Sequence, residues 1–122
     1  MPGMTQICVA LIFHIMDLVT GLIGAIRQGK VQSSKMRDGM FKKVGFMCCY
    51  ALALLIDQNA GSIGLPISGK VLPVIIVYAV TTEIVSIIEN IGKINPDLVP
   101  ARIMSLFQLD KESGVKHDAK NP

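Results

Sequence analysis

Two carboxylates, Asp17 and Glu83, lie inside long apolar stretches of the sequence. Glu83 interrupts the run VLPVIIVYAVTTEIVSIIEN (residues 71–90), and Asp17 interrupts ICVALIFHIMDLVTGLIGAI (residues 7–26). An ionised acid at the centre of a membrane helix costs about 2.5–3.5 kcal/mol. Acids retained at this cost conduct cations or protons, or they bind polar groups of neighbouring helices.

Small and polar residues accompany both acids at helical spacing. Residues three, four or seven positions apart share one face of a helix, so each acid lies on a narrow polar face while aliphatic side chains cover the rest. Small residues let two helices approach closely, and polar residues hydrogen bond across the contact. The predicted intramembrane polar seam consists of His14, Asp17, Gly21, Ala25, Thr82, Glu83, Ser86 and Asn90.

Other kinds of chemistry find little support in the sequence. His14 has only one other histidine in the chain, His117, so a zinc site has no adequate ligand set, and neither a metal nor a catalytic site is expected. The three cysteines lie in apolar runs, and two of them are adjacent, which disfavours a disulfide between them. We interpret the cysteines as small hydrophobic residues, and we expect no cofactor; they are Cys8, Cys48 and Cys49.

Two stretches of the sequence resemble motifs for the binding of nucleotides or nucleic acids. The stretch GLPISGKV (residues 64–71) matches G-x-x-x-x-G-K, but Val71 stands where a phosphate loop needs Ser or Thr for magnesium. We interpret it as a turn. The basic stretch RQGKVQSSKMRDGMFKK (residues 27–43) has one aromatic residue and no recognisable binding fold around it. Anionic lipid head groups are a better partner for this stretch than nucleic acid.

The composition favours helices in lipid. Of 122 residues, 51% are hydrophobic and 17% are charged, below the roughly 25% of soluble domains. The mean hydropathy is +0.52. We predict an all-α integral membrane protein of one domain (residues 1–122), with transmembrane helices at residues 7–26, 39–58 and 71–90. The alternative is a soluble helical protein that uses these helices as its core.

The ends of the predicted spans carry further expectations. The second span reaches membrane length only if it starts near Gly39 and extends Lys42 and Lys43 to the interface. No basic region precedes the first span, so a removable signal peptide is not expected. After a break at Gly92 and Pro96, we predict a short amphipathic helix at residues 97–109 on the membrane surface, and then a flexible tail at residues 110–122.

The basic residues predict the orientation, because short basic loops stay in the cytoplasm. The segment from residue 57 to residue 70 is expected outside, with the N-terminus, and the C-terminal tail inside. The predicted basic cytoplasmic loop contains Arg27, Lys30, Lys35, Arg37, Lys42 and Lys43.

Three blocks of the chain resemble a known family. They are MDLVTGLIGAI, SSKMRDGMFKKVGFMCCYALALLID and VYAVTTEIVSIIENIGKINPDLVPARI, and their order, spacing and hydropathy are similar to those of the toxin-secretion/phage-lysis holins. The matching positions are Asp17, Thr20 and Gly21, then Ser33, Ser34, Lys35, Gly39, Lys42 and Lys43, and finally Glu83, Ser86, Ile87, Glu89 and Asn90.

The resemblance implies a function without catalysis. Such a phage-encoded protein accumulates in the bacterial inner membrane and forms homo-oligomeric lesions that release or activate an endolysin, while some relatives export toxins. The alternative from another class is a small membrane subunit of an ion channel or transporter, in which Asp17 and Glu83 would carry cations or protons.

Overall fold

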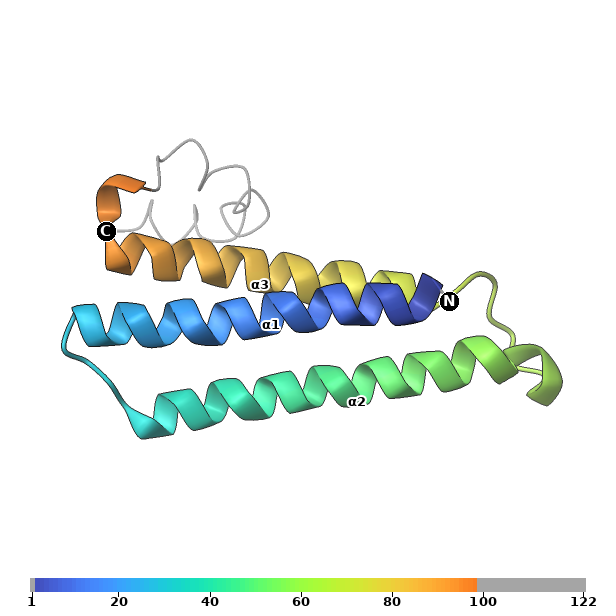
Figure 1. Cartoon of the computed structure of the whole chain (residues 1–122). Helices are drawn as coiled ribbons and strands as arrows, with labels where there is room; N and C mark the ends of the chain where they lie inside the picture. Colours follow the sequence, from blue (N-terminus) through green and yellow to red (C-terminus); the bar gives the residue numbers. More distant parts are fainter. Residues whose placement is uncertain (1, 99–122) are drawn as a thin grey trace, which may run out of the picture.

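The protein is a bundle of three long helices, as a computed structural model describes it for residues 2–98. The helices are α1 (Pro2–Arg27), α2 (Ser33–Ile63) and α3 (Leu72–Ile94), and a short 3-10 turn, η1 (Pro96–Leu98), follows. Over these residues the chain forms no strand. Figure 1 shows the three helices side by side, with α1 and α3 running in one direction and α2 in the other. The 28–32 connection and the end of α3 therefore lie at the same end of the bundle.

All three helices are long and apolar enough to cross a membrane, which confirms the predicted fold class. They are also longer than the apolar segments. The 31 residues of α2 span about 46 Å at 1.5 Å per residue, compared with roughly 30 Å for a bilayer core. Polar residues at its ends do not stop the helix, because Lys, Arg and Gln are good helix formers. The helix stops at Gly64, whose left-handed φ of 73° ends it while its N–H bonds back to the last turn.

The predicted basic loop is mostly helical, which corrects the expectation for this stretch. The connection between α1 and α2 is residues 28–32, and α2 already begins at Ser33. Arg27 ends α1 and Lys30 lies in the connection. The four other basic residues belong to the first three turns of α2; they are Lys35, Arg37, Lys42 and Lys43.

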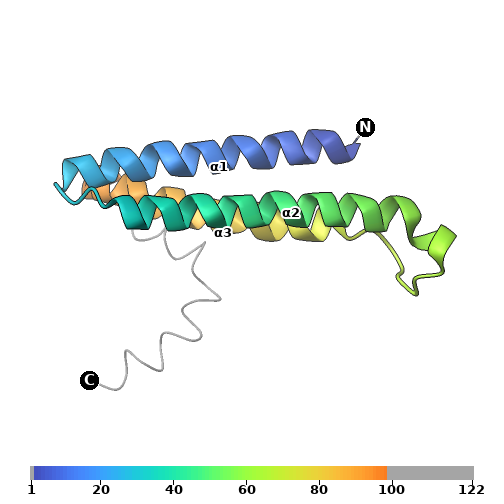
Figure 2. The same cartoon turned by 90° about the horizontal axis from the view of Figure 1, so that it is seen from below.

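The helices are packed unequally. α1 contacts α3 along much of its length, whereas α2 makes fewer contacts with either helix. At Gly24 the absence of a side chain permits this approach, since a Cβ there would lie 3.3 Å from the backbone oxygen of Asn90 and 3.3 Å from the Cβ of Lys93. α2 joins the pair through a small core that includes Phe46, Tyr50 and Ala53. Figure 2, seen from below, shows α2 in front of α3 with α1 to one side.

The distribution of polar and apolar side chains is the reverse of that in a soluble bundle. Ile15, Val74 and Tyr78 are 60%, 69% and 66% exposed, and many other large aliphatic side chains face outward. Glu83 and His14 are 1% and 2% exposed. A soluble protein buries the aliphatic side chains instead and rarely exposes large apolar surfaces. The arrangement therefore supports a multi-pass membrane protein and opposes the soluble alternative.

Asp57 of α2 fixes the start of α3. Its carboxylate accepts hydrogen bonds from the backbone N–H groups of Val71 (2.6 Å) and Leu72 (2.9 Å). A helix leaves its first N–H groups without partners, and a carboxylate there also complements the positive end of the helix dipole. The GLPISGKV stretch lies between this pair of helices and follows a helix, so it lacks the strand that a phosphate loop requires.

The structure describes the end of α3 and the first two residues of the predicted C-terminal amphipathic helix. α3 continues through Gly92 and ends at Ile94, because Pro96 disfavours a helical conformation for Asn95, which is extended (φ −154°, ψ 106°). Asp97 and Leu98 lie in the η1 turn. The rest of the predicted amphipathic helix (97–109) and the predicted tail (110–122) lie outside the described residues.

Candidate functional site

Each helix carries a stripe of residues with alternating spacings of three and four, and the stripes face the centre of the bundle. This is the spacing with which packed helices present a continuous seam to one another. Polar side chains occupy several core positions of the seam. The stripes contain Ala10, His14, Asp17, Gly21 and Gly24 on α1, Lys43, Phe46, Tyr50 and Ala53 on α2, and Ile76, Ala79, Glu83, Ser86 and Asn90 on α3.

Glu83 forms the deepest part of the polar network. It lies eleven residues from each end of α3, which runs from Leu72 to Ile94. Its Oε2 atom is 2.8 Å from His14 Nδ1 and 3.0 Å from Lys43 Nζ. The acid in the middle of the third apolar segment is therefore paired with one basic group from each of the other two helices.

His14 extends the network to α2. When Glu83 is ionised, Nδ1 carries the proton of this hydrogen bond, because a carboxylate can only accept. Its Nε2 is 2.8 Å from Tyr50 Oη. A neutral imidazole protonated at Nδ1 accepts a hydrogen bond from the tyrosine hydroxyl at Nε2, and an imidazolium donates a hydrogen bond to the tyrosine oxygen instead. Phe46 stacks on the imidazole with a centroid distance of 5.3 Å, which excludes solvent from this side.

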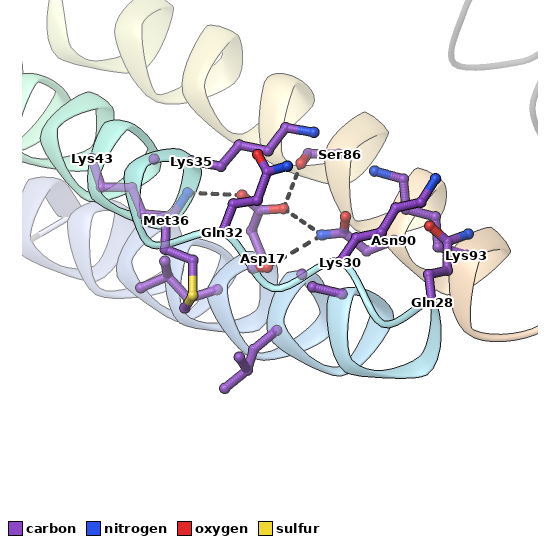
Figure 3. A pocket seen from close by; sticks show the side chains of 15 residues that line it. Asp17, Gln28, Lys30, Gln32, Lys35, Met36, Lys43, Ser86, Asn90 and Lys93 are labelled. Carbon is purple, nitrogen blue, oxygen red and sulfur yellow. Dashed lines mark hydrogen bonds and ion pairs between the residues drawn. The ribbon is translucent and has the colours of Figure 1, made fainter.

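Asp17 forms the second part of the network, closer to the 28–32 connection. Its Oδ2 atom accepts a hydrogen bond from Lys43 Nζ at 2.8 Å, and its Oδ1 atom accepts from Ser86 Oγ and from Asn90 Nδ2, the latter at 2.9 Å. Figure 3 shows these bonds converging on the carboxylate from α2 and α3. Asn90 also donates to Thr20 Oγ1 at 3.1 Å.

Lys43 joins the two parts, since its ammonium contacts both carboxylates. With a neutral His14, the two carboxylates and one ammonium carry a net charge of −1; with His14 protonated, the four groups are neutral. Paired and hydrogen-bonded charges are the form in which ionisable groups are tolerated in an apolar medium. Among the described residues, every buried side-chain nitrogen and oxygen atom has a hydrogen-bond partner.

The structure brings most of the predicted seam residues into this network. His14, Asp17, Glu83, Ser86 and Asn90 bind one another or a shared partner. Gly21 is also at the contact, since a Cβ there would lie 3.4 Å from Asn90 Nδ2, and Ala25 lines a pocket nearby. Thr82 is not part of the network. Its hydroxyl donates to the carbonyl of Tyr78 one turn earlier on its own helix.

Two network residues escaped the sequence interpretation. The sequence predicts Lys43 in a basic loop with its ammonium at the membrane interface. In the structure the residue is 6% exposed and lies between the helices. Tyr50 was not singled out, although it is 2% exposed. The signal that reveals both is the three–four spacing of Lys43, Phe46, Tyr50 and Ala53, together with the need of two acids for a cation.

The fold and the network together define a small multi-pass membrane protein with an internal polar seam. The family model described as the bacteriophage holin family matches residues 3–111, nearly the whole chain. The chain therefore belongs to the bacteriophage holin family, and this confirms the resemblance found in the sequence. The holin family is not a family of enzymes.

The comparisons with individual proteins add less. An uncharacterized protein of Halalkalibacterium halodurans is 28% identical over 79 residues, which cover 65% of this chain and 58% of that protein. This chain thus matches somewhat more than half the length of that relative. No solved structure matches the chain.

Proposed function

We propose that the chain is a holin that accumulates in the bacterial inner membrane and oligomerises into lesions, through which an endolysin reaches the cell wall. The observation that carries the proposal is the polar network enclosed by an apolar exterior, in a chain of the holin family. A lesion needs a surface that is stable in water, and this chain contains one that faces inward.

The closed bundle is suited to accumulation without damage to the membrane. Glu83 and Asp17 are balanced within the same chain by Lys43, and His14 binds Glu83. A single copy therefore presents aliphatic side chains to lipid and no unpaired charge from the network. Such a copy can remain dispersed in the bilayer at low cost.

The unequal packing supports one way in which the bundle would open. α1 and α3 approach closely at Gly24, whereas α2 is held by a smaller contact that includes Lys43 and Tyr50. If α2 moves away, both carboxylates lose their cation and require water or another copy as a partner. Outward rotation of α2 would thus turn the network into the polar lining of a lesion or into an interface between copies.

The most direct test is timed expression in bacteria with and without a co-expressed endolysin. A holin arrests growth at a set time in both strains, and the culture lyses abruptly only where the endolysin is present. Growth arrest without endolysin release, measured by cell-wall hydrolysis, would contradict the proposal.

Glu83 provides a test inside the chain. Glu83→Leu removes one acid but leaves Lys43 paired with Asp17, so the variant should insert into the membrane at least as well as the unsubstituted protein. The cells that express it should lyse late or not at all. Glu83→Gln keeps a hydrogen-bonding side chain and should have a milder effect. Asp38→Leu, at an exposed acid of α2 outside the network, is the control. The measurement is lysis time at equal membrane abundance, and a normal schedule for Glu83→Leu would remove the network from the proposed lesion.

A second candidate function is that of a small membrane subunit of an ion channel or transporter, and one hydrogen-bonded chain of residues favours it. Glu83, His14 and Tyr50 form a continuous chain of ionisable groups from α3 through α1 to α2, as expected for proton passage in a channel or transporter subunit. Reconstituted liposomes distinguish the two functions. A channel subunit passes protons or small cations and retains an entrapped protein of endolysin size, whereas a holin lesion releases both.

A further inference from the structure

A pocket opens beside the Asp17 part of the network, at the end of the bundle where α1 and α2 are connected. Its volume is about 290 Å³, close to the roughly 300 Å³ at which ligand pockets begin. The last turns of α1, the connection, the first three turns of α2 and the end of α3 line it (Figure 3). Gly39 leaves space on the α2 side, since a Cβ there would have no neighbour within 4 Å.

Three lysines from three different segments surround this pocket, which we call the lysine pocket. Lys30 lies in the connection, Lys35 in α2 and Lys93 in α3. All three are exposed, and none forms an ion pair with a carboxylate of residues 2–98. Among residues 2–98, the only acid that lines the pocket is Asp17, whose two oxygens already bind Lys43, Ser86 and Asn90. The described lining therefore favours an anion, since it offers three lysines and no carboxylate without a partner.

The remaining lining suits an anion attached to an apolar chain. Leu18, Leu22 and Met36 line the same pocket, and Leu22 and Met36 are 39% and 37% exposed on the bundle surface. The α2 helix also begins here without a side-chain cap at Gln32, so its first N–H groups add positive potential. Since α2 is longer than a bilayer core and the lysines of this end are exposed, we expect this end at the level of the head groups in a membrane.

We propose that the lysine pocket binds the phosphodiester head group of one anionic phospholipid, with Lys30, Lys35 and Lys93 around the phosphate and an acyl chain along Leu22 and Met36. Basic pockets between membrane helices are the usual binding sites for such head groups. A lipid bound there joins the first turns of α2 to α1 and α3 and holds the bundle closed. This assignment requires the membrane location and is independent of lesion formation.

The test measures lipid binding to the full-length protein in detergent micelles. Native mass spectrometry follows the one-to-one complex during titration with dioleoylphosphatidylglycerol. Replacement of the three pocket lysines by glutamine should weaken this complex at least about tenfold, whereas replacement by arginine should retain it. The matched control removes three charges that lie outside the pocket at the same end, by Arg27→Gln, Arg37→Gln and Lys42→Gln, and should change the affinity by less than about threefold.

Each alternative has its own outcome. Equal weakening in the glutamine variant and the control would show charge attraction without a pocket and overturn the proposal. Competition by glycerophosphoglycerol at lipid-like concentrations would assign the pocket to a free phosphate ester, and equal binding of dioleoylphosphatidylcholine would exclude recognition of anionic charge. Loss of binding in the arginine variant, with unchanged helical circular dichroism, would also overturn it. None of these results depends on whether the protein lyses cells.

Discussion

Lys43 holds the network together at the scale of single residues, because its ammonium is the only fully charged basic group within reach of both carboxylates among the described residues. A pair of acids in an apolar medium is tolerable only while a cation lies between them. Removal of that cation leaves two charges without compensation, which costs more than the loss of a hydrogen bond. The stability of the closed bundle should therefore depend more on Lys43 than on any other polar residue.

We predict that Lys43→Met lowers the free energy of unfolding by about 3–5 kcal/mol, the usual cost of breaking a buried ion pair. Thermal or sodium dodecyl sulfate unfolding in micelles, followed by circular dichroism, measures the change. Lys42→Met is the control, because Lys42 is the preceding residue and is exposed. Adding Glu83→Gln to Lys43→Met should restore part of the loss, and equal stability of both single variants would contradict the role of Lys43.

The same residue shows where sequence reasoning reaches its limit. Asp17, Ser86 and Asn90 were predictable because a polar group inside an apolar segment must find a partner. Lys43 sits near the edge of its apolar segment, where a long side chain can extend either to the interface or to the interior. Only the packing of α2 decides between these, since it determines which face of the helix meets the acids.

At the scale of elements, α1 and α3 act as one unit because the seam between them is narrow at Gly24 and Gly21. The existence of three helices follows from hydropathy, and their polar faces follow from spacing. The unequal separation of the three helices cannot be derived from the sequence in this way, because it depends on which small residues lie opposite large ones. Most helix ends also lie beyond the predicted transmembrane segments, because polar residues with good helix propensity continue the helices past the apolar residues.

Gly24→Leu should separate α1 from α3, because its Cβ alone would lie 3.3 Å from both the Asn90 oxygen and the Lys93 Cβ. We expect a loss of about 1–3 kcal/mol, as for other overpacked contacts. Gly45→Leu is the matched control, since a Cβ there has no neighbour within 4 Å and gains the same helix propensity. Unfolding in micelles compares the two, and equal stability would show that the close approach is not required.

The Asp57 contact predicts a local effect at the start of α3. Asp57→Ala should speed hydrogen exchange at the N–H groups of Val71 and Leu72, which lose their acceptor. Asn59→Ala, which removes a side chain bonded to its own helix, should leave these N–H groups unchanged. Exchange followed by NMR in micelles reads both positions directly. Unchanged protection in Asp57→Ala would mean that another acceptor serves the helix start.

At the scale of the whole molecule, three alternating helices place the two connections on opposite sides of the membrane. The 28–32 connection and the end of α3 lie together at one end, and residues 64–71 lie at the other. This arrangement agrees in form with the orientation that the basic residues predict. Which end faces the cytoplasm remains a prediction from the distribution of Lys and Arg.

The orientation can be tested with introduced cysteines after replacement of Cys8, Cys48 and Cys49. Ser34→Cys, at the start of α2, should resist an impermeant thiol reagent in intact cells, while Ser62→Cys, in its last turn, should react. Permeabilised cells provide the control, because both sites should then react. The opposite pattern would invert the topology, and reaction at both sites in intact cells would require a different number of spans.

Under the proposed function, the pairing of Lys43 with both acids inside one copy would also determine the order of events when copies meet. One opened copy would expose its charges to lipid, whereas several copies that open together would supply partners to one another. Such assembly has an unfavourable first step and favourable later steps, which is nucleated growth. Under the proposed function we expect a lag that shortens steeply as copy number rises, and then an abrupt release. The amount of protein in the membrane would set the moment of lysis.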